Sequence, residues 1–159
     1  MDYFITFRTY GTWLHGDERG AVDKQHNGVG QEVLPPHRGL ERAMSQALQH
    51  DKVLLDVACR ACVKHTIREV ASYRGWEIRT LSVQTNHVHV VVNAEVTPEK
   101  VMSDFKSYAT RRLREAKLLA SDAQAWSSHG STRYLKTPET IQAACQYVAE
   151  DQADLSDCP

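Results

Sequence analysis

The sequence predicts an α+β fold: an antiparallel sheet with its helices on one face, in the order βαββαβ, followed by one more helix. Three observations lead to this prediction. Runs rich in β-branched and aromatic residues alternate with segments in which apolar residues recur every three to four positions. Two of the helical segments begin with the same Thr-Pro-Glu start signal. Two strand-like runs are separated by only two residues, which is typical of a hairpin and therefore of antiparallel pairing.

The composition is that of a soluble globular protein, with 42% hydrophobic and 25% charged residues in a chain of 159. We expect one domain over residues 1–153, interrupted by a long loop at 11–38, and a tail at 154–159. No apolar run approaches the roughly 20 residues of a membrane span, and no signal peptide is visible, so we expect a cytoplasmic protein with reduced cysteines. Cys59 and Cys62 lack a second cysteine pair, and we interpret them as helix residues rather than zinc ligands.

The first half of the chain holds one strand and one long helix. Aromatic and β-branched residues alternate over residues 2–10, which predicts a strand buried on both faces. The loop at 11–38 has five glycines and a Pro-Pro pair, and a short helix is expected at 39–50. A long helix follows from about 51 to 73 and ends at Gly75. Its apolar stripe has helical spacing: Leu54, Val57, Ala58, Ala61, Ile67 and Val70.

A predicted hairpin joins a strand at 76–84 through the two-residue turn Thr85-Asn86 to the strand that carries His87 and His89. Four of the eight residues at 85–92 are valine. Side chains at i and i+2 share a face of a strand, so His87 and His89 project together while the valines between them face the other way. Two imidazoles on one rigid strand can hold a metal ion, given one or two oxygen ligands from elsewhere. The alternative is one solvent-exposed histidine and one hydrogen-bonded core histidine.

The next helix begins at Thr97, the expected N-cap, with Pro98 at its first position. Its predicted buried stripe has the same spacing as that of the first helix: Met102, Phe105, Ala109 and Leu113. The other faces carry six basic against three acidic residues, a net charge of +3, although the whole chain has a net charge of −1. This helix is therefore either a solvated basic face or a surface that binds phosphates.

The last part of the chain holds a polar loop at 121–130 around Trp126, a short fourth strand at 131–136, and a helix from Thr137 to about Asp151. The stripe of this last helix is Ile141, Ala144, Cys145 and Val148. The first six elements match the split βαβ, or ferredoxin-like, motif, and the last helix is an addition to it.

Four short motifs occur in order on this pattern, and together they resemble the HUH single-tyrosine transposases. That family includes small bacterial insertion-sequence transposases and REP-associated tyrosine transposases. The resemblance extends from Tyr3 to Gln152, apart from the long loop. The motifs are Asn86-His87-Val88-His89 on a central strand, Phe105-Lys106-Ser107 in the next helix, Trp126 before a glycine-containing turn, and Gln146-Tyr147-Val148 in the last helix.

The resemblance implies that His87 and His89 bind magnesium or manganese beside Tyr147, the nucleophile. Its attack on DNA would leave a covalent 5′-phosphotyrosine and a free 3′-hydroxyl, so that a second strand can reverse the step without ATP. The family often has Gln or Asn as a third ligand one turn after the tyrosine. Here Asp151 occupies that position and Gln152 follows it, and we assign Asp151 as the third ligand with Gln152 left open.

The implied partner is single-stranded or hairpin DNA, bound by a bacterial enzyme of the cytoplasm and nucleoid. We expect Lys106, Arg111 and Arg112 to contact the DNA backbone, and Trp126 or Trp13 to stack on bases. The family contains both monomers and homodimers, so the sequence leaves the oligomeric state open.

Two other functions stay open at this stage. One is a nucleic-acid-binding module of ferredoxin-like fold that does not cleave. The other is a metal phosphoesterase that uses water in place of a tyrosine. Tyr108, which lies 19 residues after His89 on the basic helix, competes with Tyr147 as the nucleophile.

Overall fold

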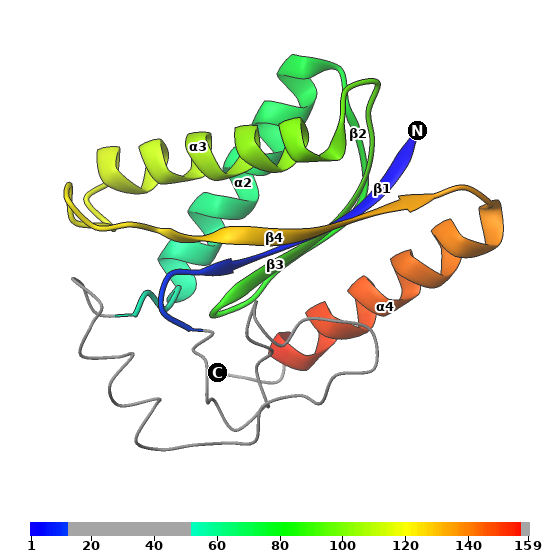
Figure 1. Cartoon of the computed structure of the whole chain (residues 1–159). Helices are drawn as coiled ribbons and strands as arrows, with labels where there is room; N and C mark the ends of the chain where they lie inside the picture. The colour runs from blue at the N-terminus through cyan, green and yellow to red at the C-terminus, as the bar shows by residue number, and fades with distance from the viewer. Residues whose placement is uncertain (13–51, 157–159) are drawn as a thin grey trace, which may run out of the picture.

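The computed structural model describes residues 1–12 and 52–156, with side chains described as far as Asp151. Most of the predicted loop at 11–38, the predicted helix at 39–50 and Trp13 lie outside these residues. The described elements, shown in Figure 1, are β1 (Asp2–Thr9), α2 (Val57–Arg74), β2 (Glu77–Val83), β3 (His87–Asn93), α3 (Pro98–Glu115), β4 (Trp126–Leu135) and α4 (Pro138–Ser156).

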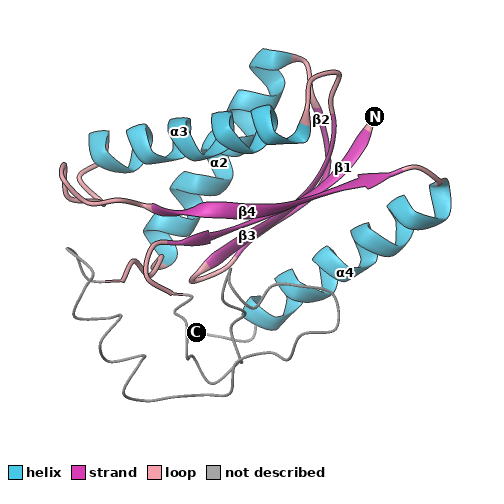
Figure 2. Cartoon of the chain, in the orientation of Figure 1, coloured by secondary structure: helices cyan, strands magenta, loops and turns pink. Residues whose placement is uncertain are grey.

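The strands form one antiparallel sheet in the order β2-β3-β1-β4, which confirms the predicted βαββαβ arrangement (Figure 2). Strand β3 is central and pairs with β1 on one side and β2 on the other. The β2–β3 connection is the predicted hairpin, closed by a hydrogen bond from the Gln84 backbone N–H to the His87 carbonyl oxygen.

Helices α2 and α3 cover one face of the sheet, and α4 lies on the opposite face (Figure 1). The main core fills the first interface, where Phe7, Ile67 and Phe105 are fully buried. A separate and smaller cluster joins α4 to the sheet: Val91, Leu135, Ala144 and Val148. The two faces of β3 therefore pack against different layers. Its even-numbered valines lie in the main core, while His87, His89 and Val91 face α4.

The start of α3 and the end of α2 lie where the local signals predict, but the start of α2 does not. Thr97 caps α3 by accepting a hydrogen bond from the Lys100 backbone N–H, and Gly75 ends α2 in the left-handed region at φ +77°. The predicted start of α2 at residue 51 is wrong, because the Asp56 carboxylate accepts a hydrogen bond from Cys59 N–H and begins the helix there. The first part of the predicted stripe is also wrong, because four of its six residues are exposed: Leu54, Val57, Ala58 and Ala61.

Two further boundaries differ from the prediction. Strand β4 begins at Trp126, so residues 126–130 belong to the sheet and not to a loop, because they pair with β1 around a register shift. Helix α4 continues past Asp151 to Ser156, into the predicted tail, because no Gly or Pro interrupts the sequence before Pro159.

Candidate active site

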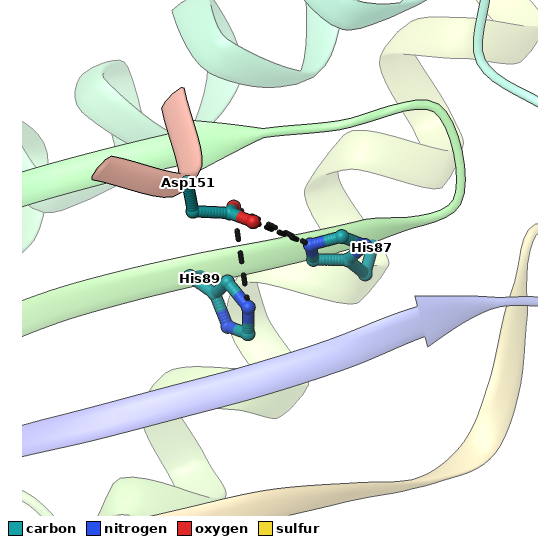
Figure 3. A group of neighbouring side chains, drawn as sticks. All are labelled: His87, His89 and Asp151. Carbon is teal, nitrogen blue, oxygen red and sulfur yellow. Dashed lines mark hydrogen bonds and ion pairs between the residues drawn. The ribbon is translucent and has the colours of Figure 1, made fainter. Parts of the chain in front are cut away.

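The site forms where the last turns of α4 pass over the β2–β3 hairpin. His87 and His89 project from β3 toward α4, which confirms the prediction that they share a face. Asp151 approaches from α4 (Figure 3). One potential ligand atom from each of these three residues lies within 4.8 Å of the other two.

The Asp151 carboxylate faces the Nε2 atoms of both imidazoles. Its two oxygens lie 3.4 Å and 3.3 Å from His87 Nε2, and Oδ2 lies 4.0 Å from His89 Nε2. The two imidazole rings are 4.6 Å apart between centroids. Two ring nitrogens and a carboxylate therefore converge on one small volume, an arrangement that can hold a divalent cation.

The second nitrogen of each ring is held by a neighbour, so both Nε2 atoms point into the cluster. His87 Nδ1 lies 2.8 Å from Asn86 Oδ1, and His89 Nδ1 lies 2.7 Å from Thr6 Oγ1. A carbonyl oxygen only accepts, so Nδ1 of a neutral His87 carries the proton and Nε2 carries the lone pair. This is the pattern of metal-binding histidines, whose outer hydrogen bonds fix the tautomer and the ring orientation.

His89 is suited to remain uncharged. Its side chain is buried beneath α4, and desolvation together with the neighbouring His87 lowers its pKa to about 4. A neutral imidazole is the form that binds a metal ion. The donor set of the cluster therefore fits a divalent cation at neutral pH.

Tyr147 lies one helical turn before Asp151 and beside the cluster. Its ring centroid is 5.5 Å from that of His89 and 6.0 Å from that of Phe4. The residue is 54% exposed, which confirms the expectation that it lies off the buried stripe of α4. The phenol is thus next to the candidate ligands and open to a large substrate.

Tyr108 occupies a different environment. It lies on α3, across the sheet from the histidines, and it packs against the main core. The Arg111 guanidinium covers its ring at 5.3 Å from the centroid. Of the two candidate nucleophiles, Tyr147 lies beside the histidines and Asp151, and Tyr108 does not.

The predicted DNA-binding residues are on α3, and they divide between two sides of that helix. Lys106 and Arg111 line an open groove of about 780 Å³ between α3 and the segment that leads into β4. Lys106 Nζ donates hydrogen bonds to the Ser127 and His129 carbonyl oxygens, 3.1 Å and 3.3 Å away. Arg112 turns toward α2, where it forms an ion pair of 2.7 Å with Glu69.

Trp126 is buried, with 5% of its surface exposed. Its ring packs edge-on against Phe7, and its Nε1 donates a hydrogen bond to the Lys106 carbonyl oxygen at the base of the groove. Stacking on a base requires an accessible ring face, and the burial of Trp126 against Phe7 therefore speaks against the expectation that Trp126 stacks on a base.

Sequence reasoning missed the polar residues around the cluster. Ser82 on β2 and Gln84, directly after that strand, reach Asp151, and Arg8 on β1 pairs with His87 in the sheet. A signal was present, because Ser82 and Gln84 alternate with the buried Leu81 and Val83 and so share a face. Only the pairing of Ser82 with His89 shows that this face is the one that carries the histidines.

The chain is similar to known proteins in its sequence and in its fold. The sequence model of a family described as IS200-like transposases matches residues 47–150, more than half of the chain. No curated protein matches the chain. Among solved structures, the chain is similar to a REP-associated tyrosine transposase bound to a REP hairpin, with a TM-score of 0.56 and 12% identity, over 96% of this chain and 67% of that one.

A second solved structure is that of a candidate transposase from Deinococcus radiodurans R1, with a TM-score of 0.49 and 16% identity, over 96% of this chain and 90% of that one. The first of these two similarities establishes that the chain shares the fold of a tyrosine transposase domain.

Proposed function

This chain belongs to the IS200-like transposase family, and we propose that it cleaves and rejoins single-stranded DNA through a covalent bond to Tyr147, with the help of a divalent metal ion. The observation that carries this proposal is the meeting of Tyr147 with His87, His89 and Asp151 at one end of α4. Nucleophile and candidate ligands come from elements far apart in the sequence, and the fold brings them together.

In the proposed reaction, the Tyr147 hydroxyl oxygen attacks the scissile phosphorus. The hydroxyl group gives up its proton as a bond forms between its oxygen and phosphorus; the bond to the 3′ oxygen breaks, and the 3′ oxygen takes up a proton and leaves as a hydroxyl group. Reversal by a second strand's 3′-hydroxyl rejoins DNA and restores the free tyrosine. The half-exposed position of Tyr147 supports this role, since a nucleic acid strand must reach it.

His87, His89 and Asp151 would hold magnesium or manganese. When bound, such an ion polarises the phosphate and stabilises the charge that develops on it. The protein's own contribution is orientation: Asn86 and Thr6 fix the imidazoles, and burial keeps His89 neutral. Asp151 supplies the negative charge that draws a cation to the two imidazoles.

Hairpin-bearing DNA is the proposed substrate, since the structurally similar REP-associated transposase is bound to a REP hairpin. Lys106 and Arg111 would face the DNA backbone in the groove beside α3. This groove lies across the sheet from Tyr147, so one DNA molecule would have to pass an edge of the sheet to contact both.

The decisive experiment incubates the protein with manganese and labelled single-stranded DNA from the regions flanking its gene, and scores covalent protein–DNA adducts. Tyr147→Phe should keep DNA binding and abolish both cleavage and adducts, because Phe has no nucleophilic oxygen. Tyr108→Phe is the matched control and should retain both activities. Cleavage without an adduct in both variants would identify water as the nucleophile, and binding without cleavage in the wild type would identify a DNA-binding module.

A further inference from the structure

The end of strand β2 and the turn that follows it present two polar side chains to the site beneath α4, Ser82 in the strand and Gln84 directly after it. Ser82 is fully buried and stands directly opposite His89 in the β2–β3 pairing. Gln84 is 6% exposed, and its backbone N–H donates a hydrogen bond to the His87 carbonyl oxygen at the hairpin turn. Both residues are therefore held in fixed register with the candidate metal ligands. Buried polar groups in a core require partners, and these two find theirs on α4.

Ser82 and Gln84 donate the hydrogen bonds, and Asp151 accepts at the end of the chain of bonds. Gln84 Nε2 donates to Ser82 Oγ at 2.9 Å, and Ser82 Oγ donates to Asp151 Oδ2 at 2.9 Å. The second hydrogen of Gln84 Nε2 goes to the Asp151 backbone carbonyl oxygen. A hydroxyl group has one hydrogen, so Ser82, which accepts from Gln84, turns that hydrogen toward the carboxylate.

These contacts fix both the backbone and the side chain of Asp151. The bond to the backbone carbonyl oxygen holds the turn of α4 around Asp151 against the end of β2. The bond to Oδ2 sets the rotation of the carboxylate, so that both of its oxygens lie within 3.4 Å of His87 Nε2. An aspartate near the end of a helix that lacked these contacts would be free to turn toward solvent and away from the imidazoles.

We propose that Ser82 and Gln84 are positioning residues that orient Asp151 for metal binding, an inference that rests on the proposed function. They need not touch the metal ion or the DNA. Outer hydrogen-bond partners of this kind set the orientation and basicity of a ligand, and their loss usually costs about 10- to 100-fold in metal affinity.

The test measures the dissociation constant of manganese for the full chain by calorimetry, in the absence of DNA. Ser82→Ala should weaken manganese binding by about tenfold or more. Gln84→Met, which keeps the length of the side chain but has no N–H donor, should weaken it in the same direction. If Ser82→Ala does not fold, Gln84→Met carries the test alone.

Thr66→Val is the matched control. Thr66 is 3% exposed on α2, across the sheet from the site, and its hydroxyl donates to the Cys62 carbonyl oxygen. This variant loses one buried, hydrogen-bonded hydroxyl group, as Ser82→Ala does, and should lower the melting temperature but leave the manganese affinity unchanged. If the role of Ser82 were purely structural, Ser82→Ala would likewise lower the melting temperature and leave the manganese affinity unchanged.

The outcomes separate this inference from the proposed function. If the wild type binds manganese and Ser82→Ala and Gln84→Met bind it equally well, the positioning role is overturned and the metal site stands. If the wild type binds no more manganese than His87→Ala does, both the metal site and the inference fail. Weaker manganese binding in Ser82→Ala and Gln84→Met, with unchanged manganese binding in Thr66→Val, supports the positioning role.

Discussion

Val148→Ala should loosen helix α4 without loosening the rest of the protein. Val148 is fully buried, and it belongs to the small cluster that joins α4 to the sheet. Val63 is also fully buried, but it lies on α2 in the main core. The two valines permit a comparison of the same chemical change in two layers of one molecule.

Each substitution deletes two buried methyl-sized groups, at about 0.8 kcal/mol each, and the cavity left behind raises the cost to about 2 to 3 kcal/mol. In Val148→Ala this cost falls on the cluster that holds α4. The equilibrium constant for opening of α4 should then rise by roughly 30- to 150-fold, at about 1.4 kcal/mol for each factor of ten. In Val63→Ala the same cost falls on global unfolding.

Native-state hydrogen exchange of the α4 amides measures the difference. Protection of α4 should fall in Val148→Ala and remain in Val63→Ala, as long as α4 opens before the main core does. Equal loss of α4 protection in the two variants would refute the reasoning. It would show that the helix and the main core open as one unit, although their apolar clusters are separate.

Three further predictions concern DNA binding, pH and packing. Replacing Lys106, Arg111 and Arg112 by Ala should weaken binding of all DNA sequences alike and reduce its salt dependence, and an unchanged salt slope would show a merely solvated face. Burial would raise the pKa of Asp2, but hydrogen bonds from an arginine on β2 and an asparagine on β3 hold it below its usual range. The free energy of unfolding that the Asp2 carboxylate contributes should therefore be fully present above about pH 4 and be lost as the pH falls through the lowered pKa. Acid unfolding of Asp2→Asn should lack this pH-dependent loss. Gly130→Ala would place a methyl group against a methionine of α3 and 2.8 Å from a β1 carbonyl oxygen, so thermal unfolding should show a loss of about 1 to 3 kcal/mol.

The sequence by itself determined most of the elements, because their signals are local. Alternation along β3 placed His87 and His89 on one face, and this follows from the pleat alone. The Thr97 cap, the glycine at the end of α2 and the two-residue turn between β2 and β3 are also decided by neighbours within a few residues. Tyr147 could be placed at the rim of its helix from helical spacing alone.

The packing of helices and loops onto the sheet required the tertiary structure. Trp126 resembles a loop residue in a polar stretch, yet pairing with β1 draws it into the core against Phe7. The segment before α2, residues 52–56, follows the same principle. Leu55 N–H binds the Thr85 carbonyl oxygen, so this segment runs beside the hairpin and the helix begins only at Val57. In each case a partner distant in the sequence outweighs the local pattern.

The candidate site shows the same division. Its ligand types were visible in the sequence, but Asp151 is 62 residues from His89, and no local rule states which face of the sheet α4 covers. The small cluster around Val148 decides that, because burying it orients the helix with Asp151 over the histidines. Long-range burial of apolar surface positions the carboxylate, and the hydrogen bonds from β2 then fix its rotation.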